Sequence, residues 1–322
     1  MTSQPAIEAQ GLVKRYKKST ALDGVDLEVP RGTVHGLLGP NGAGKTTAVR
    51  ILATLTHADE GQAKVAGWDT RSQPREVRRR IGLTGQQTAI DDLMTARQNL
   101  TMFGKLFRLN KSEAQHRADE LLDTFGLTEA AGRTPKKFSG GMRRRLDLAA
   151  SMILAPQVLF LDEPTTGLDP AGRRGMWEAV RHLASQGTTV LLTTHYLDEA
   201  DKLCDRISVI DHGRNFIEDT PAGLKQRIGD EWLELVASDP ADVGELEQLV
   251  MRVLHSEPVL DEAEARLSVS VQNGVAALTA VAAEISAQRL DIADIGLRRP
   301  TLDEAFLHLT TPEPEKTLEE TR

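Results

Sequence analysis

A glycine-rich stretch at residues 39–47 constrains this chain more than any other part of its sequence. It matches the phosphate-binding loop pattern, in which two glycines five positions apart are followed by a lysine and a hydroxyl residue. Residues 34–38 before it are predicted to form a short strand, and residues 46–55 after it, which lack glycine and proline, a helix. This context favours a nucleotide site over an ordinary glycine-rich turn. The residues expected to contact the nucleotide here are Gly39, Asn41, Gly42, Gly44, Lys45, Thr46 and Thr47.

The chemistry expected of such a loop follows from its residue types. Glycines let backbone N–H groups turn inward around an anion without Cβ clashes. The helix that begins near Lys45 adds the partial positive charge of its N-terminus. Lys45 can then reach the β- and γ-phosphates, and the hydroxyl of Thr46 can bind Mg²⁺. The loop therefore predicts that the phosphates of a nucleotide bind at this turn.

Length and composition limit what else the chain can be. The 322 residues allow two domains of about 150 residues each. A net charge of −8 does not indicate a general nucleic-acid binder, which is usually basic. Cys204 is the only cysteine, which rules out an intramolecular disulfide and fits a reducing cytoplasm. Residues 1–8 are too polar for a signal peptide, and the most apolar stretch, 146–161, is interrupted by Asp147 and Pro156. We expect a soluble chain that reaches a membrane only through a partner.

Alternating strand and helix patterns in the first two thirds of the chain predict an α/β fold with a mostly parallel sheet. Two antiparallel strands, 7–13 and 24–29, precede the phosphate loop, and residues 88–155 form a helical insertion. Ser112 and Gln115 are predicted to form a capping box in that insertion. The later predicted strands are 81–84, 158–161, 188–193, 206–211 and 215–219, the last two joined by a turn at His212-Gly213.

The last third of the chain has a different pattern. Strands and helices follow one another in a βα-ββ-αβ rhythm, which predicts a ferredoxin-like α+β domain. We place the nucleotide-binding domain at residues 1–224 and this accessory domain at residues 225–310. A short helix is predicted at residues 301–309, and the charged tail at residues 311–322 is expected to be disordered.

Two carboxylates follow a fully apolar run at residues 158–161. The run predicts a buried strand that delivers Asp162 and Glu163 to the phosphate loop, and His195 follows the next predicted strand. Ligands bind at such C-terminal strand ends in α/β sheets. Asp162 is placed to hold Mg²⁺, and Glu163 to polarise an attacking water as a general base. An acidic turn after a strand is the alternative, and the phosphate loop makes it the weaker one.

A Ser139-Gly140-Gly141 motif opens a predicted helix within the helical insertion. Such a helix start can bind an anion, although a glycine-rich helix cap is the better reading of the motif in isolation. It lies on the insertion, and we do not expect it to reach the phosphates held by residues 39–47 of the same chain. The Arg143-Arg144-Arg145 run that follows is predicted to be a solvated helix face rather than a phosphate site.

Taken together, the motifs resemble those of ABC ATPases, whose signature is usually Leu-Ser-Gly-Gly-Gln, over residues 7–224. The resemblance implies that Gln86 senses Mg²⁺ and faces a transport subunit. It implies that Asp169 belongs to a loop crossing a dimer interface and that His195 contacts the γ-phosphate. Tyr16 resembles the aromatic residue that stacks on adenine, although a buried strand-end tyrosine is the alternative.

The resemblance also implies a working assembly. ATP and Mg²⁺ would bind to a head-to-tail homodimer, with each ATP between residues 39–47 of one copy and Ser139, Gly140 and Gly141 of the other. Thr46, Gln86 and Asp162 would hold the metal, and Glu163 would carry hydrolysis together with Lys45 and His195. Hydrolysis would then remove the contact that favours the closed dimer.

Three details narrow the resemblance to the daunorubicin-resistance type of drug exporter ATPase. Met142 replaces the glutamine of the signature, residues 194–201 read Thr-His-Tyr-Leu-Asp-Glu-Ala-Asp, and residues 299–307 read Arg-Pro-Thr-Leu-Asp-Glu-Ala-Phe-Leu. This implies a peripheral subunit on the cytoplasmic face of the membrane. It would power efflux of a hydrophobic drug or natural product through a separate membrane permease and would bind no nucleic acid.

Other readings stay open at this point. The first is a soluble ABC ATPase of translation or DNA repair, but many of those carry two cassettes or a long coiled coil, and this chain has one cassette and no sustained heptads. An exporter of lipid or peptide is the second. The third is a GTPase or kinase-like protein, since Asn110-Lys111-Ser112-Glu113 is similar to a guanine-reading motif, although it ends in Glu rather than Asp.

Overall fold

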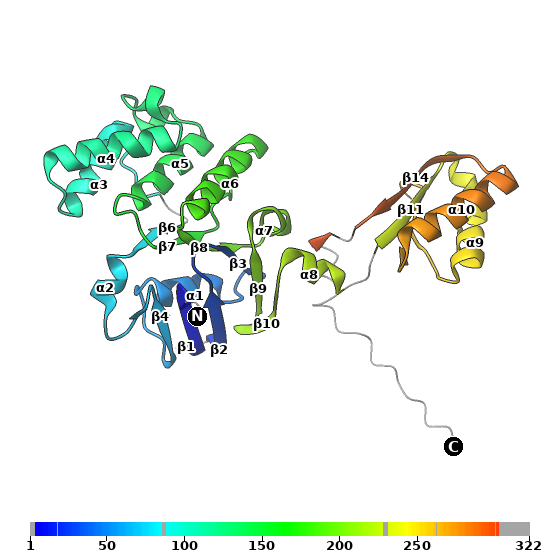
Figure 1. Cartoon of the computed structure of the whole chain (residues 1–322), viewed down its shortest axis with the longest axis horizontal. Coiled ribbons are helices and arrows are strands. Elements are labelled where there is room, and N and C mark those ends of the chain that lie inside the picture. Colours follow the sequence, from blue (N-terminus) through cyan, green and yellow to red (C-terminus); the bar gives the residue numbers. More distant parts are fainter. Residues whose placement is uncertain are drawn as a thin grey trace, which may run out of the picture. The chain divides into compact units, whose positions relative to one another are not determined.

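The computed structural model describes residues 4–17, 19–85, 88–227, 231–261, 263–299 and 301–302. The chain forms two compact units, Met1–Thr220 and Pro221–Arg322, each of which folds around strands and helices of its own (Figure 1).

A six-stranded sheet forms the centre of the first unit, with strand order β10-β9-β3-β8-β7-β6. All neighbours in it are parallel except β9 and β10, so that the predicted, mostly parallel sheet is confirmed. The central strands β3, β7 and β8 are fully buried, as the apolar run at residues 158–161 predicted for β7. The bounds are β3 (Val34–Leu38), β6 (Ile81–Thr84), β7 (Val158–Asp162), β8 (Thr189–Thr194), β9 (Arg206–Asp211) and β10 (Arg214–Asp219).

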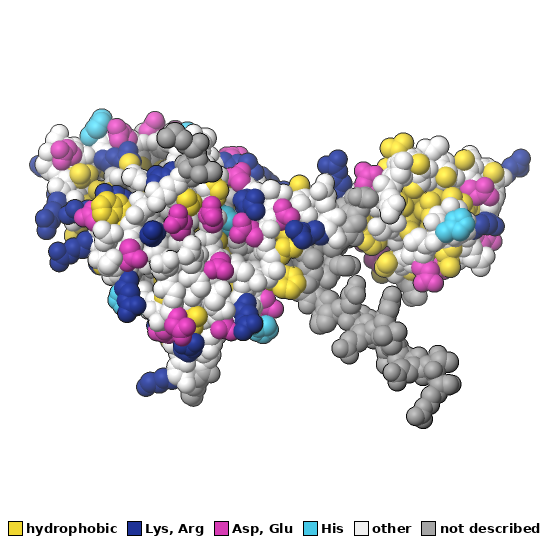
Figure 2. All heavy atoms as spheres, turned by 60° about the horizontal axis from the view of Figure 1, so that its bottom comes forward, with side chains coloured by type: hydrophobic (Ala, Val, Ile, Leu, Met, Phe, Trp, Pro, Cys, Tyr) yellow, Lys and Arg dark blue, Asp and Glu magenta, His cyan; other side chains and the backbone are white. Residues whose placement is uncertain are grey.

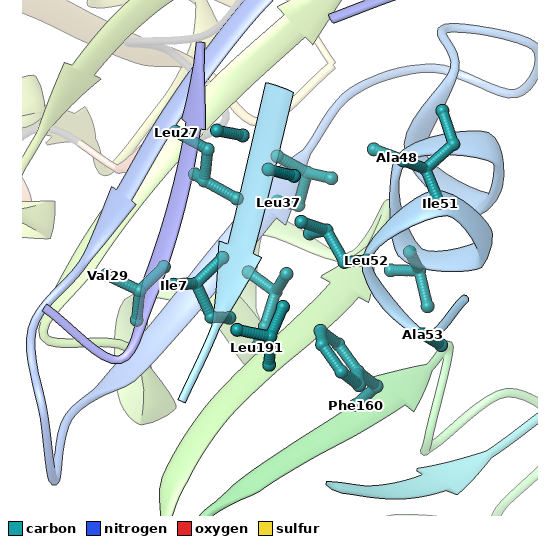
Figure 3. Close-up of a cluster of buried hydrophobic side chains, with 14 of the residues drawn as sticks. Ile7, Leu27, Val29, Leu37, Ala48, Ile51, Leu52, Ala53, Phe160 and Leu191 are labelled. Carbon is teal, nitrogen blue, oxygen red and sulfur yellow. The ribbon is translucent and has the colours of Figure 1, made fainter. Parts of the chain in front are cut away.

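An antiparallel sheet of order β2-β1-β4-β5 packs beside the phosphate loop. Helix α1 (Lys45–Leu52), which follows that loop, contributes its apolar face to a core shared with both sheets. In Figure 3, Leu52 of this helix lies near Leu37 and Phe160 of the central sheet. The helix is thereby fixed against the strands whose ends carry the site. The antiparallel strands are β1 (Ile7–Tyr16), β2 (Ser19–Val29), β4 (Glu60–Val65) and β5 (Trp68–Asp69).

The predicted helical insertion is present and lies apart from the antiparallel sheet (Figure 1). Its helix α4 (Lys111–Thr124) begins at a capping box formed by Asn110 and Glu113. Glu113 N donates to Asn110 Oδ1 over 2.9 Å, and Asn110 N donates to Glu113 Oε2 over 2.8 Å. The predicted Ser112–Gln115 box is therefore wrong, because Asn110 already has the extended backbone of an N-cap. The resemblance to a guanine-reading motif is explained by this cap.

The remaining helices of the first unit surround the central sheet or belong to the insertion. Short 3-10 turns at Thr128–Ala130 and Pro135–Lys137 lead into α5. The helices are α2 (Pro74–Arg78), α3 (Ala96–Leu106), α4 (Lys111–Thr124), α5 (Gly140–Ser151), α6 (Pro170–Ser185) and α7 (Leu197–Leu203). The hairpin β9–β10 turns at His212 and Gly213, both with positive φ, as predicted.

The second unit is a four-stranded antiparallel sheet of order β12-β13-β11-β14. A βα-ββ-αβ chain gives this order in the ferredoxin-like arrangement, which agrees with the predicted fold class. Every second side chain of β11, at residues 233, 235 and 237, is buried and packs in a core with the apolar faces of α9 and α10. The elements are α8 (Pro221–Gln226), β11 (Glu231–Ala237), a 3-10 turn (Pro240–Asp242), α9 (Val243–Leu254), β12 (Val259–Asp261), β13 (Arg266–Val271), α10 (Gly274–Gln288) and β14 (Ile292–Arg298).

Some sequence predictions fall beyond the described ranges. Of the helix predicted at residues 301–309, only residues 301–302 are described, and the tail at residues 311–322 lies outside them. None of the described helices combines the length and apolarity that crossing a bilayer requires. On the face shown in Figure 2, acidic and basic side chains are interspersed over the first unit.

Candidate functional site

The predicted phosphate loop connects β3 to α1 and depends on glycine at two close approaches. Gly44 is the N-cap of α1 with a φ of 108°, a left-handed value that favours glycine. A Cβ at Gly44 would collide with the carbonyl oxygen of Ala21, and a Cβ at Gly39 with that of Ile210. The loop is therefore pressed against two neighbouring segments and leaves no room for side chains there. Gly42 and Asn41 are exposed, and Thr47 is half-buried.

Lys45 occupies the first turn of α1 and folds back over the loop. Its side-chain nitrogen donates to the carbonyl oxygens of Gly39 (2.5 Å) and Pro40 (3.0 Å), and the residue is only 5% exposed. Burial lowers the pKa of Lys45, while the nearby carboxylates of Glu163 and Asp162 act in the opposite direction. A nearly buried ammonium between a glycine-rich loop and a helix N-terminus is the arrangement that binds phosphate anions.

Asp162 ends β7 beneath this loop and is almost fully buried. The hydroxyl of Thr193 donates to its Oδ1 over 2.6 Å, and Thr46 Oγ1 lies 3.2 and 3.3 Å from its two carboxylate oxygens. A hydroxyl beside a carboxylate is an oxygen donor pair that suits Mg²⁺, which in phosphate-transfer sites takes few protein ligands. In the described part of the chain no group of three or more His, Cys, Asp or Glu side chains could form a fuller metal cage. Thr46 and Asp162 therefore fit a Mg²⁺ bound together with phosphates.

Glu163 follows Asp162 with a φ of 49°, which is rare for a residue with a side chain. Its backbone nitrogen donates to the carbonyl oxygen and to the hydroxyl oxygen of Thr193, each over an N···O distance of 3.1 Å. Such backbone costs about 1–3 kcal/mol and persists only where surrounding contacts hold it. The turn directs the carboxylate to His195, whose Nδ1 lies 3.1 Å from Glu163 Oε1, and Thr166 Oγ1 lies 3.4 Å from Oε2.

These contacts assemble much of the predicted site at one end of the central sheet. Lys45, Thr46, Asp162, Glu163 and His195 meet where β3, β7 and β8 end. Parallel neighbours bring strand ends together at one edge, which is where ligands bind in such sheets. The arrangement can hold a phosphate chain with its metal and place a carboxylate beside it.

The Ser139-Gly140-Gly141 motif lies at a different place. Ser139 is the N-cap of α5, and its Oγ accepts from Met142 N over 3.3 Å. Asp169 is the N-cap of α6, and its Oδ1 accepts from Gly172 N over 2.9 Å. The starts of α5 and α6 touch, since a Cβ on Gly141 would come within 3.1 Å of the Cα of Gly172. The signature motif at residues 139–141 and Asp169 therefore form one surface. No hydrogen bond among the described residues joins this surface to the phosphate loop.

Two other predicted residues have simpler placements. Tyr16 is the last residue of β1 and is 48% exposed, with the Lys14 ammonium 5.7 Å from its ring centroid. An exposed ring is compatible with stacking, and the alternative of a buried strand-end tyrosine is wrong. Gln86 lies outside the described residues.

The sequence did not predict two side chains that support the site. In the sequence, Thr193 looks like any β-branched core residue of β8. Its role in binding Asp162 and Glu163 depends on the strand register, which sets it opposite Asp162 on β7. Arg144 belongs to a run predicted as a solvated helix face, and that prediction is wrong for it. Its side chain is 11% exposed and binds backbone carbonyls around both acids.

Comparison with known proteins agrees with this geometry. Residues 22–166 match the model of a family described as ABC transporter. The chain is 58% identical over 312 residues to the daunorubicin resistance ATP-binding protein DrrA2 of Streptomyces coeruleorubidus, covering 97% of each chain. It is 34% identical over 307 residues to the linearmycin resistance ATP-binding protein LnrL of Bacillus subtilis (strain 168), covering 94% of this chain and 98% of that one.

Solved structures show the same fold for the first unit. The ADP conformation of an ATP-binding cassette from an ABC transporter aligns with a TM-score of 0.63 and 25% identity, over 68% of this chain and 92% of that one. A dimeric post-hydrolysis cassette bound to ADP and phosphate aligns with a TM-score of 0.60 and 27% identity, over 66% of this chain and 98% of that one.

Proposed function

The chain belongs to the ABC transporter family of ATP-binding proteins, and from this premise we propose how it uses ATP and for what transport. Members of this family bind and hydrolyse ATP, and the chain is therefore an ATPase. We propose that it powers the efflux of a hydrophobic drug or natural product through a separate membrane permease. The observation that carries the chemistry is the pairing of Glu163 with His195 beside the phosphate loop.

The proposed reaction is attack of water on the γ-phosphorus of ATP, which breaks the bond to the β,γ-bridging oxygen and releases ADP and phosphate. Glu163 accepts the proton of that water, and His195, hydrogen-bonded to the same carboxylate, keeps its side chain directed at the site. Lys45 and the N-terminus of α1 offset charge on the phosphate oxygens. Mg²⁺ held by Thr46 and Asp162, with Gln86 as a further ligand, would neutralise the remaining phosphate charge.

We propose that the site is completed by a second copy of the chain. Ser139, Gly140 and Gly141 start a helix away from the phosphate loop of their own chain, and Asp169 lies beside them. A head-to-tail dimer would lay that helix start on the phosphates bound by the partner copy. The dimeric post-hydrolysis cassette with ADP and phosphate supports this arrangement. ATP then joins the two copies, and hydrolysis releases them. Tyr16 would stack on the adenine of the ATP bound in its own chain.

A permease partner is supported by the exposed apolar side chains of the helical insertion. Leu93 is 87% exposed, Leu106 68% and Phe107 48%. Met94 and Met102 line a groove beside Leu106 on α3. Contiguous exposed apolar surface, such as this groove, can mark an interaction site. We propose that a cytoplasmic part of the permease packs here, which places the chain at the cytoplasmic face of the membrane.

The cargo is proposed from the relatives. Relatives that match nearly the whole chain are named for resistance to daunorubicin, doxorubicin and linearmycin. Nod factor export ATP-binding proteins match about three quarters of it, at 41–43% identity, so that export of a Nod factor is the second candidate. No observation on the described residues favours the translation, DNA-repair or GTPase alternatives.

Purification from native membranes tests the partner. The chain should co-purify in detergent with one multi-span membrane protein, and the complex should hydrolyse ATP. Recovery with ribosomes or DNA, and with no membrane protein, would contradict the export proposal and favour a non-transport ABC ATPase.

A further inference from the structure

Arg144 is the buried centre of a hydrogen-bond cluster behind the two acids. Its guanidinium donates to the carbonyl oxygens of Gly85 (2.8 Å), Pro164 (3.0 Å), Asp162 (3.2 Å) and Glu163 (3.4 Å). Three of these four carbonyls belong to the turn that carries the predicted metal ligand and general base. One side chain from α5 therefore holds the backbone of the catalytic turn from behind.

Asp147, one turn further along α5, completes the cluster. Its Oδ2 lies 3.5 Å from Arg144 Nη1, and its Oδ1 accepts from Ala89 N over 3.2 Å. Arg144 thus binds the backbone carbonyl of Gly85, and Asp147 binds the backbone N–H of Ala89. These two residues lie on either side of residues 86–87 in the sequence. Burial lowers the pKa of Arg144 and raises that of Asp147, while their mutual attraction opposes both shifts.

The catalytic turn needs such support because Glu163 has left-handed backbone. Strained residues persist only where several contacts define them together. Thr193 holds the N–H of Glu163 from β8, and Arg144 holds the carbonyls of Asp162, Glu163 and Pro164 from α5. A planar guanidinium reaches several carbonyls at fixed angles, which a lysine ammonium cannot do.

We propose that Arg144 is a positioning residue that couples the Ser139 end of α5 to the catalytic turn. The inference rests on the proposed function, in which the start of α5 binds the ATP of the partner copy. A shift of α5 on closing of the dimer then moves the backbone of Glu163 directly, without contact between Arg144 and ATP. Each copy thereby aligns its own general base when its helix engages the opposite nucleotide.

Steady-state kinetics of the full-length chain with MgATP test this. We expect Arg144→Gln to lower kcat about 10- to 100-fold while the KM for ATP changes less than about threefold, because the base is misplaced and the phosphate loop is intact. Arg144→Lys keeps the charge without the fork and should fall between Arg144→Gln and the wild type. ATP-dependent dimers should still form in both variants, which loss of folding would not allow.

Arg145→Gln is the matched control, because Arg145 neighbours it on α5 and donates to the carbonyl of Phe125 over 3.1 Å, away from the acids. It should keep kcat within about threefold of the wild type. In a Glu163→Gln background, Arg144→Gln should lower kcat no further, since both changes disable one base.

A wild-type kcat in Arg144→Gln, an equal loss in Arg145→Gln, or additive losses in the double variant would each overturn the inference. The proposed function would fail separately, through turnover retained in Glu163→Gln alone.

Discussion

The buried histidine of the central sheet makes the first unit sensitive to acid. His35 on β3 is fully buried, and its Nε2 lies 2.8 Å from Ser208 Oγ, which donates to Glu218 Oε2 over 3.0 Å. Because the Ser208 hydroxyl is used by Glu218, Nε2 must be the protonated nitrogen. Nδ1 is buried, with no hydrogen-bond partner among the described residues. A second proton would therefore have to sit on Nδ1 unpaired.

The size of the effect follows from the shifted pKa. Burial lowers the pKa of His35 from 6.5 to about 4, with Arg206 acting in the same direction and Glu218 and Asp205 opposing it. Above pH 6.5 the imidazole is neutral in both folded and unfolded chains, and stability is complete. As the pH falls below 6.5, only the unfolded chain binds the proton, so that stability is lost towards pH 4. At pH 5 the loss amounts to about 2 kcal/mol, from 1.36 kcal/mol per pH unit.

Urea unfolding at pH 7.5, 6.0 and 5.0, followed by circular dichroism, measures this loss. His35→Gln keeps a donor for Ser208 but cannot titrate. Between pH 7.5 and pH 5 the free energy of unfolding of the wild type should therefore fall by about 2 kcal/mol more than that of His35→Gln. His57→Gln controls for removal of a surface histidine. Parallel pH profiles for wild type and His35→Gln would refute the reasoning.

Two further substitutions test the site itself. Thr193→Val removes the hydroxyl between Asp162 and Glu163 and should cost about 2 kcal/mol in the free energy of unfolding, with a matching loss of ATPase activity. Thr193→Ser should restore both, and equal stability of the two variants would contradict the assigned bonds. Lys45→Ala removes a charged donor to the phosphates and should weaken ATP binding about 10- to 100-fold in calorimetric titration. An unchanged affinity would remove Lys45 from the phosphate site.

Local patterns were sufficient to predict the strand ends that carry the candidate site. The phosphate loop, the apolar run before Asp162 and the β-branched run before His195 each carry their signal within about ten residues. The antiparallel sheet of the second unit was predictable for the same reason, because its strands and helices alternate with clear periods. Gln86 and the segment beyond residue 302 remain predictions.

The supporting residues could not be predicted because their roles depend on which segments become neighbours. Thr193 matters only because β8 pairs with β7 in a register that sets it opposite Asp162. Arg144 looked like one charge in a solvated run, yet α5 packs so that its guanidinium reaches carbonyls 18 to 20 and 59 residues away in sequence. The cap of α4 was misplaced by two residues, because Asn110 and Ser112 are both good N-cap residues and only the backbone decides between them.

The central claim is that Glu163 activates the water while the rest of the site binds ATP between two copies of the chain. Glu163→Gln keeps the size of the side chain and a hydrogen-bonding group for His195 but removes the base. With MgATP, its turnover should fall by at least about 100-fold, and gel filtration with light scattering should show a stable ATP-bound dimer that the wild type forms only transiently. Turnover near that of the wild type, or a variant that stays monomeric with saturating ATP, would contradict the account.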